Sequence, residues 1–388
     1  MAFKAPSPPP NNKAHRANGA SRRDDATAAS RPAVETQHNG EVERFAGTWP
    51  TNFTKGLEHD DFGIVKDGLF QTFLKAINPE ESNKDRWSFD VPPPNAGAFF
   101  TKNGNMDWGT LVWESPLAGQ HYDVQGPQAS AVGMAPAPQL GSDELVAEMA
   151  EVYALALLRD TPFTDFTAET DEVKKRLEDL NALPWFNGGA VEDADGDPID
   201  DQARNRRAAR GGTQTGQTAF RGSGPGCMEG PYISQFMLQG TKSRNKDADV
   251  AAGLTGTAED GYVTLGANQI DQRVIPQKEG RDYMVSWAEW LDVQNGANKG
   301  GAQAFKGPRR FITTPRDLAT YVHYDALYQA YLHATLILLD WGAPGDRGLP
   351  EPTDTRAAFA MFGGPHILTL VTETATRALK AVRRQKFH

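Results

Sequence analysis

Apolar residues recur at helical spacing in several parts of the chain, most regularly near its end. One set follows the spacing of a single buried helical stripe and comprises Ile367, Val371, Ala375, Ala378 and Val382. Charged residues keep the same spacing on the opposite side, at Glu373, Arg377, Lys380 and Arg384. Pro365 stands in the first turn, where its missing amide hydrogen costs nothing. The pattern therefore predicts a helix from residue 363 to the end of the chain.

Lys386 lies in the last turn of this predicted helix. It follows Val382 by four residues, so it lies about 40° from that position around the helix axis. This places its ammonium on the inward stripe, where a buried cation needs an anionic partner. The alternative is that a lysine at the end of a helix complements the helix dipole and extends to water. Spacing by itself leaves both interpretations open.

Helical patterns of other lengths occur earlier in the chain. Helices are predicted over residues 142–159, 171–183, 281–293 and 314–342, the second of them with a weaker pattern, and a helix or part of one is predicted over 62–77. Ser142 and Thr314 are the expected N-caps of two of them. The inward positions of the first are predicted to be Leu145, Met149, Val152, Ala156 and Leu157. In the third, a stripe of Met284, Trp287, Trp290 and Leu291 is predicted to pack in the core. Together these helices predict a mainly α-helical bundle, with 314–342 as its longest member.

Composition sets the broad class of the chain. Residues 1–45 are rich in Pro, Ala, Ser and Arg and predict a disordered tail, so the folded part is expected over 46–388. A formal net charge of -10 argues against a nucleic-acid partner. No segment has the apolar length of a membrane span or of a secretory signal, which makes a cytoplasmic location the expectation. The single cysteine, Cys227, is predicted to be a small, partly buried residue in a glycine-rich loop.

Residue spacing identifies no metal site and no set of catalytic residues. The acidic stretch from 192 to 198 resembles a calcium loop, but an EF-hand needs glycine where Pro198 stands and glutamate where Arg204 stands. A solvated loop is therefore predicted. His323 and His333 are expected on one helix but about 80° apart around its axis, which is poor geometry for joint ligation.

Several stretches carry a resemblance to a known family. They are Leu111–Pro116, Glu148–Phe163, Gly230–Phe236, Arg316–Ala319, Tyr321–Asp325, Tyr328–Tyr331 and Phe362–Leu368. In this order they resemble the N-terminal half of the algal-type and bacterial vanadium-dependent haloperoxidases. That family shares a superfamily with the type 2 phosphatidic acid phosphatases. The resemblance implies a helical bundle of the vanadium haloperoxidase type, with vanadate as cofactor and hydrogen peroxide and halide as substrates.

The resemblance also gives Lys386 a role. In the family a lysine at the end of such a helix opens the first vanadate-binding motif, and Lys386 occupies the matching position. The family's later Pro-Ser-Gly-His and Ser-Arg segments have no match in these 388 residues. The expectation is therefore a fold truncated before the C-terminal vanadate-binding half, with an incomplete pocket and little or no activity in this chain alone.

Two alternatives from other functional classes remain open at this stage. One is a non-catalytic helical scaffold that complements a separate C-terminal half. The other is an acid phosphatase of the same superfamily, because one oxyanion pocket serves both chemistries. Homo-oligomers are common in the family, so the resemblance also implies self-association. Neither a membrane nor a nucleic acid is an expected partner.

Overall fold

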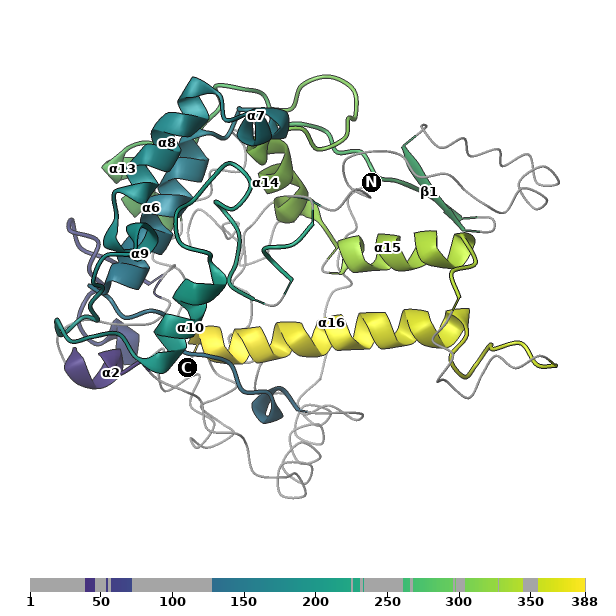
Figure 1. Cartoon of the computed structure of the whole chain (residues 1–388), viewed down its shortest axis with the longest axis horizontal. Coiled ribbons are helices and arrows are strands. Elements are labelled where there is room, and N and C mark those ends of the chain that lie inside the picture. The colour runs from purple at the N-terminus through teal and green to yellow at the C-terminus, as the bar shows by residue number, and fades with distance from the viewer. Residues whose placement is uncertain are drawn as a thin grey trace, which may run out of the picture. The chain divides into compact units, whose positions relative to one another are not determined.

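The computed structural model describes residues 39–45, 54, 57–71, 128–224, 226–230, 233, 261–265, 268–295, 297, 304–326, 328–344 and 355–387. These residues are mainly helical, with one two-stranded sheet among them (Figure 1). The chain divides into two compact units. One contains residues 1–137, 281–303 and 377–388, and the other contains 138–280 and 304–376. Mainly helical architecture, as predicted, is confirmed for the described residues.

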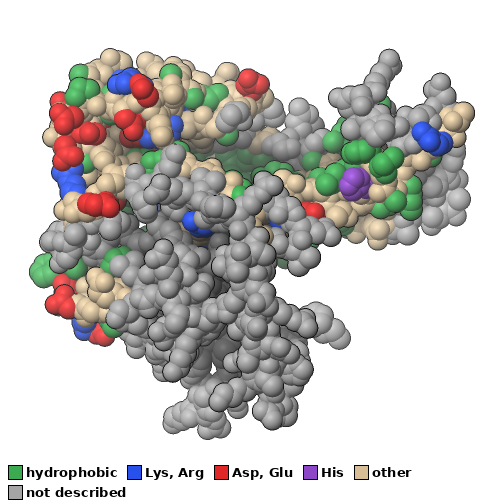
Figure 2. Space-filling model, turned by 90° about the horizontal axis from the view of Figure 1, so that it is seen from below, with side chains coloured by type: hydrophobic (Ala, Val, Ile, Leu, Met, Phe, Trp, Pro, Cys, Tyr) green, Lys and Arg blue, Asp and Glu red, His purple; other side chains and the backbone are tan. Residues whose placement is uncertain are grey.

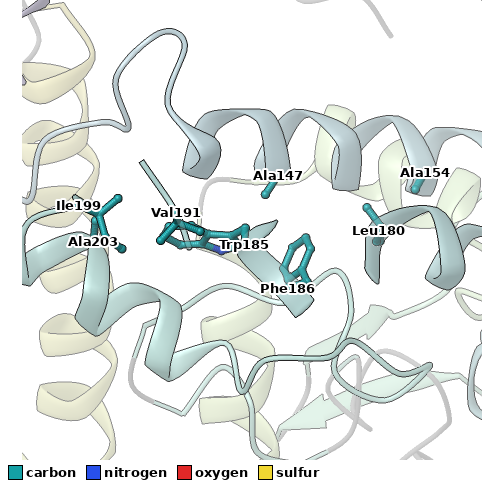
Figure 3. Packing of buried hydrophobic residues seen from close by; sticks show 8 residues of the cluster. All are labelled: Ala147, Ala154, Leu180, Trp185, Phe186, Val191, Ile199 and Ala203. Carbon is teal, nitrogen blue, oxygen red and sulfur yellow. The ribbon is translucent and has the colours of Figure 1, made fainter. Parts of the chain in front are cut away.

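The core of the larger unit forms where three helices pack together. They are α6 (Asp143–Leu157), α8 (Asp171–Asn181) and α9 (Pro184–Asn187). Ser142 caps α6 by accepting a hydrogen bond from the Leu145 amide at 3.2 Å, as predicted. The buried cluster comprises Ala147, Ala154, Leu180, Trp185, Phe186, Val191, Ile199 and Ala203 (Figure 3). Ile199 and Ala203 reach it from the segment that leads into α10 (Asp201–Ala209) and from that helix.

The face of α6 that is buried differs from the predicted one. Ala147 and Ala154 are buried, as is Glu144, whereas Met149, Val152 and Leu157 are exposed. The prediction was wrong because the inner face consists of small residues and glutamates, whose charge is compensated across the interface. Arg206 donates to both carboxylate oxygens of Glu144, at 2.5 and 2.7 Å. A second pair joins Glu151 to Arg210, so arginines from α10 and the residue after it take the place of apolar partners.

A second buried cluster lies beside the first in the same unit. It comprises Leu158, Phe166, Val173, Leu177 and Ala219. Phe166 comes from the short helix α7 (Phe163–Ala168), and its ring packs edge-on against Phe220 at a centroid distance of 5.7 Å. The cluster fixes the end of α6 and the turn that follows it.

The sheet is a hairpin that the helical prediction did not anticipate. Strands β1 (Tyr262–Leu265) and β2 (Asn268–Asp271) pair antiparallel, with Tyr262 opposite Asp271 and Leu265 opposite Asn268. Isolated bridges continue the pairing beyond β2, from Val274 to Arg310 and from Gln277 to Phe305. β1 also contacts α15 (Gln329–Asp340). The two bridges therefore join the segment after β2 to the segment that enters α14.

The long helix predicted over 314–342 is two helices. α14 (Pro315–Tyr324) ends at Asp325, whose ψ of 156° is extended, and α15 begins only at Gln329. The Gln329 side chain accepts a hydrogen bond from the Ala326 amide at 3.1 Å, which satisfies a donor in the break. Apolar periodicity continues through the break, so the sequence pattern concealed it.

The last helix, α16 (Gly364–Phe387), is confirmed as predicted. Exposed apolar side chains occur on α15 and around the beginning of α16, at Tyr331, Leu338, Phe359, Met361 and Leu370. Figure 2 shows hydrophobic side chains gathered beside a histidine at the right of the view, in the region where Figure 1 draws these helices. No helix of the described residues is both long and apolar enough to span a bilayer.

In the smaller unit, aromatic residues of α13 (Trp287–Gln294) cover a turn. Trp287 and Trp290 stack with ring centroids 4.7 Å apart, and Trp287 donates its indole N–H to the Asp61 carbonyl at 2.9 Å. None of the residues of α13 is fully buried, and Trp287 is 55% exposed, so the predicted core packing of this stripe is wrong. The rings lie against Gly63 instead.

Two further predictions concern segments that are only partly described. Within 62–77, where a helix or part of one was predicted, residues 62–68 form turns and a β-bridge, because the Asp60 carboxylate accepts the amides of Phe62 and Ile64, each at 2.9 Å. Residues 69–71 are helical, so the prediction holds only for these residues of the described part. Residues 72–77 lie outside the described residues. Most of the predicted tail over 1–45 also lies outside them, apart from 39–45, which contain the short helix α2 (Glu41–Arg44).

Candidate functional site

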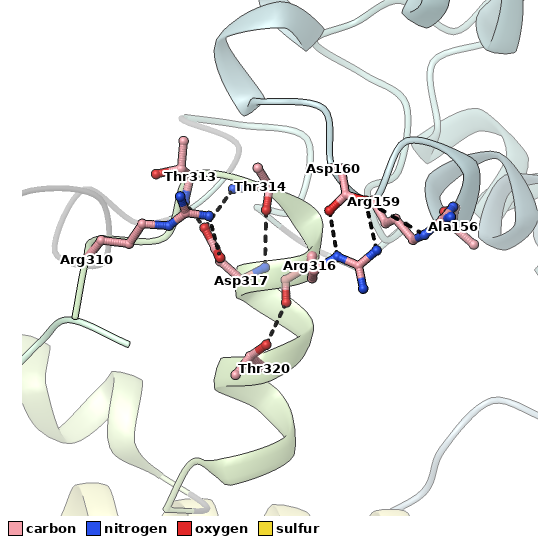
Figure 4. Close-up of polar contacts among 9 residues, drawn as sticks. All are labelled: Ala156, Arg159, Asp160, Arg310, Thr313, Thr314, Arg316, Asp317 and Thr320. Carbon is pink, nitrogen blue, oxygen red and sulfur yellow. Dashed lines mark hydrogen bonds and ion pairs between the residues drawn. The ribbon is translucent and has the colours of Figure 1, made fainter. Parts of the chain in front are cut away.

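Two of the family-like stretches, far apart in the sequence, contact each other in the larger unit (Figure 4). The Arg316 guanidinium donates to both carboxylate oxygens of Asp160, from Nε at 2.5 Å and from Nη2 at 2.8 Å. The Arg316 amide also donates to the Arg159 carbonyl at 2.8 Å. This two-point ion pair holds the start of α14 against the end of the α6 segment.

The next residue, Asp317, is fully buried and closes the start of α14. Its carboxylate accepts the amides of Thr313 and Thr314 at 3.0 and 3.3 Å, and Arg310 donates to it at 3.0 Å. Thr314 completes a capping box by accepting the Asp317 amide at 3.3 Å. The buried carboxylate is thus compensated by amides and one guanidinium, which makes it a structural group and not a general base.

The start of α16 is fixed by a tight turn that carries another family-like stretch. A Cβ atom on Gly363 would lie 2.4 Å from the backbone of Phe359, so only glycine fits there. Phe362, at a φ of 54°, donates its amide to Nδ1 of His366 at 2.9 Å. Nδ1 therefore acts as the acceptor, which assigns the ring proton of a neutral imidazole to Nε2.

Lys386, the residue predicted to bind vanadate, lies in the last turn of α16 with an exposed side chain. The predicted inward stripe holds in the first half of the helix, where Ile367, Val371 and Ala375 are half-buried. In the second half it does not: Val382 is exposed and Ala381 is buried. The expectation that the Lys386 ammonium points inward is therefore wrong in this structure.

The buried face of the final turns is the one that carries arginines. Ala381 lies between Arg377 and Arg384 on one side of the helix, and both arginines are half-buried. Long arginine stems cover apolar surface while their guanidinium groups keep polar contacts, so charge alone was a poor guide to the outer face. Lys386 lies about 140° from Ala381 around the axis. Its role toward an oxyanion stays a prediction from the family resemblance.

The chemistry of this helix end suits an anion. Arg383, Arg384 and Lys386 bring three cations into one turn, and Arg and Lys are the residues that bind tetrahedral oxyanions. They also complement the negative end of the helix dipole. No group of three or more His, Cys, Asp or Glu residues placed to hold a metal ion occurs among the described residues. The donor set fits a vanadate oxygen in type, with Lys386 as its outermost member.

The acidic loop after α9 is accounted for by its own backbone. Asp193 accepts the amides of Asp195 and Asp197 at 2.9 and 3.0 Å, and a bridge joins Glu192 to Pro198. The carboxylate most central to a calcium loop is therefore engaged in a turn, which fits the predicted solvated loop.

Two predictions about reactive side chains are corrected by the structure. His323 and His333 lie on different helices, α14 and α15, and not on one: His323 is exposed and His333 is buried. Burial lowers the pKa of His333 and favours its neutral form. Cys227 is exposed and not partly buried.

Comparisons with known proteins agree with the family resemblance. No family model matches the chain. It is 38% identical over 385 residues to the vanadium-dependent bromoperoxidase of Corallina pilulifera and 37% identical to that of Corallina officinalis. Both matches cover 93% of this chain and 63% of the relative, so the chain spans about 63% of the length of these relatives. A bromoperoxidase of Ascophyllum nodosum is 28% identical over 367 residues.

A solved structure supports the fold. The homohexameric vanadate-dependent bromoperoxidase of Ascophyllum nodosum superimposes with a TM-score of 0.62 at 22% sequence identity. The match covers 98% of this chain and 57% of that one. At this identity the superposition supports the architecture only.

Proposed function

We propose that this chain, which belongs to the vanadium-dependent haloperoxidase family, takes part in the vanadate-dependent oxidation of halide by hydrogen peroxide. The observation that carries the proposal is its 37–38% identity, over 93% of its length, to vanadium-dependent bromoperoxidases. The Arg316–Asp160 contact supports it, because it joins two of the family-like stretches within one packed unit. Bromide is the halide that the relatives' names suggest.

Lys386 is the residue of this chain that we assign to vanadate. Bound vanadate would supply Lewis-acid activation of hydrogen peroxide. The lysine would donate a charge-assisted hydrogen bond to a vanadate oxygen and would help to hold its negative charge. The neighbouring cations Arg383 and Arg384 support this assignment, because they raise the positive potential of the same helix end.

Vanadate affinity is the decisive measurement, because Lys386 is the single residue of this chain that we assign to the cofactor. Binding of orthovanadate to the 388-residue chain would be followed by vanadium-51 NMR and by equilibrium dialysis. Lys386→Gln should weaken it about tenfold, as expected for the loss of one charge-assisted hydrogen bond. Lys380→Gln, on the same helix, is the matched control and should change it less than twofold. Equal effects of the two substitutions would remove Lys386 from the proposal.

Assays of catalytic turnover distinguish the haloperoxidase reaction from the phosphatase alternative. We expect little or no peroxide-dependent bromination of a dione substrate by the 388-residue chain, because one assigned cofactor residue does not make a pocket. Robust vanadate-dependent bromination would contradict that expectation while supporting the family reaction. Release of phosphate from a phosphate monoester without peroxide would favour the phosphatase alternative instead.

We also propose that the chain self-associates through the outer face of α6. Val146, Met149, Tyr153 and Leu157 follow i, i+3, i+7, i+11 spacing and are all exposed. A stripe of four large apolar residues is typical of a helix that packs against a partner. The structural neighbour is homohexameric, which favours a second copy of this chain as that partner.

The molar mass of the protein in solution tests whether the chain self-associates. Size-exclusion chromatography with light scattering should give a multiple of the 42.3 kDa chain mass. Leu157→Lys should shift the protein toward the monomer, whereas Phe62→Lys, which charges an even more exposed apolar residue elsewhere, should leave the mass unchanged. A monomeric wild-type chain would contradict the proposal.

A further inference from the structure

The larger unit contains a cavity of about 370 Å³ that uses none of the residues assigned to vanadate. It lies where the segment after β2, the segment around Phe305–Arg309 and the end of α14 come together. The lining residues that matter here are Asp271, Arg273, Phe305, Arg309, Tyr321 and Tyr324. A volume of this size is typical of sites for small organic molecules.

One part of the lining is cationic. Arg273 donates from Nε to Asp271 at 2.9 Å, and Nε of Arg309 lies 3.8 Å from the second oxygen of the same carboxylate. Arg309 also donates to the Arg273 carbonyl at 3.0 Å. Burial would raise the pKa of Asp271, but the hydrogen bonds from Arg273 outweigh that effect and lower it, so this carboxylate stays ionised. Two guanidinium groups thus share one carboxylate, so this group of three side chains carries one net positive charge, while the other carboxylate of the lining, Asp325, acts on Tyr321.

A second part is aromatic. The rings of Phe305 and Tyr324 lie with centroids 5.9 Å apart and planes tilted by 57°. Both side chains are about half exposed, so each ring offers area to a molecule in the cavity. Planar aromatic molecules pack well in such a tilted pair.

The third feature is a buried phenol. Tyr321 is 9% exposed, and its hydroxyl has no hydrogen-bond partner among the described residues. Burial, with a smaller contribution from the Asp325 carboxylate, raises the pKa of Tyr321 to about 12. The phenol therefore keeps its proton and remains a donor at neutral pH. A buried donor without an acceptor is costly, so an acceptor atom in the cavity would be stabilising.

We propose that this cavity binds a small aromatic carboxylate that carries a second oxygen acceptor. The carboxylate pairs with Arg309, the ring packs against Phe305 and Tyr324, and the second oxygen accepts the Tyr321 hydroxyl. An inorganic anion would satisfy only the cationic part, and Asp325, which also lines the cavity, opposes a purely electrostatic site. The inference does not depend on the proposed haloperoxidase function.

A series of ligands tests the three contacts without any mutation. 4-Hydroxybenzoate should bind the full chain with a dissociation constant of about 1 mM or lower, as measured by saturation-transfer NMR and calorimetry. Benzoate lacks the phenolic oxygen, 4-hydroxybenzyl alcohol lacks the carboxylate, and inorganic phosphate lacks the ring. Each should bind at least about fivefold more weakly than 4-hydroxybenzoate. No binding of 4-hydroxybenzoate, or equal binding of all four, would overturn the proposal.

Two substitutions locate the site. Arg309→Gln should weaken 4-hydroxybenzoate about tenfold and leave 4-hydroxybenzyl alcohol unchanged, because only the former has a carboxylate. Tyr321→Phe should remove the preference for 4-hydroxybenzoate over benzoate. Arg204→Gln, which changes an exposed arginine on α10, is the control and should alter neither ligand. Ligand preferences that survive both cavity substitutions would place the binding elsewhere and refute the assignment.

Discussion

Arg316 and Asp160 form a two-point ion pair across 156 residues of sequence, with both guanidinium donors within 2.8 Å of the carboxylate. The arginine side chain is 7% exposed and the aspartate side chain 37% exposed. The pair therefore contains a buried cation whose counter-ion lies partly in water. Because burial is so unequal, the two ends of the pair should respond differently to substitution.

Asp160→Asn should destabilise the larger unit, because it leaves the buried Arg316 guanidinium without its full counter-charge. Loss of a charged hydrogen-bond partner of a buried group costs about 1–3 kcal/mol in free energy of unfolding. Urea denaturation followed by circular dichroism measures it. Asp201→Asn breaks the exposed pair with Arg204 and is the matched control, with an expected loss below about 0.5 kcal/mol. Equal losses would mean that the Arg316 pair is solvated as fully as a surface pair.

Gly63 and Gly68 have the same φ of 79° but different surroundings. A Cβ atom at Gly63 would lie 2.9 Å from the Trp290 ring, whereas one at Gly68 would meet nothing within 4 Å. Alanine at either position should cost about 1 kcal/mol for the left-handed backbone. Gly63→Ala should cost about 1–2 kcal/mol more, because it must displace the stacked indoles. Urea denaturation followed by tryptophan fluorescence gives the free energy of unfolding of both variants. Equal losses would mean that the Trp290 ring moves away from the added methyl group at no cost.

The stability that Thr314 contributes at the start of α14 should come from its hydroxyl oxygen and not from its methyl group. Thr314→Ala removes the acceptor of the Asp317 amide and should lower the free energy of unfolding by about 1–2 kcal/mol. Thr314→Ser keeps the hydroxyl and should retain most of the stability. Thermal denaturation of the three proteins makes the comparison. A serine variant as unstable as the alanine variant would assign the effect to the lost methyl group instead.

The sequence pattern located helices and their first residues better than it located their buried faces. Ser142 and Thr314 were correctly identified as N-caps, because capping depends on a local hydrogen bond that a short motif encodes. The predicted inward face of α6 was wrong, because the buried Glu144 and the partly buried Glu151 are compensated by arginines far along the sequence. Such pairing leaves no trace in periodicity.

The candidate site shows the same division between local and long-range information. The family and the helix α16 could be predicted from motifs and periodicity, but the burial of Ala381 between two arginines could not. Nor could the cavity beside Tyr321, whose walls come from three segments that meet only after folding. The break between α14 and α15 depends on the extended backbone at Asp325, which continuous apolar spacing does not reveal.

His333 should make the folded state sensitive to mild acid. Its imidazole is buried on α15, and burial lowers its pKa below the ordinary value of 6.5. The unfolded chain therefore binds this proton at a higher pH than the folded chain does. The contribution to stability is fully present above about pH 6.5 and is lost as the pH falls toward the folded-state pKa.

Two substitutions on α15 isolate that effect. His333→Leu removes the titrating group, so the free energy of unfolding should fall less between pH 7.5 and pH 5 than in the wild type. Ile337→Val, at a buried position one turn later, should lower stability by about 1 kcal/mol at every pH, without changing the slope. Urea denaturation at half-unit pH intervals gives both curves. If the free energy of unfolding of His333→Leu varied with pH as steeply as that of the wild type, other groups would cause the acid sensitivity. The buried imidazole would then contribute no difference in proton binding between the folded and unfolded states.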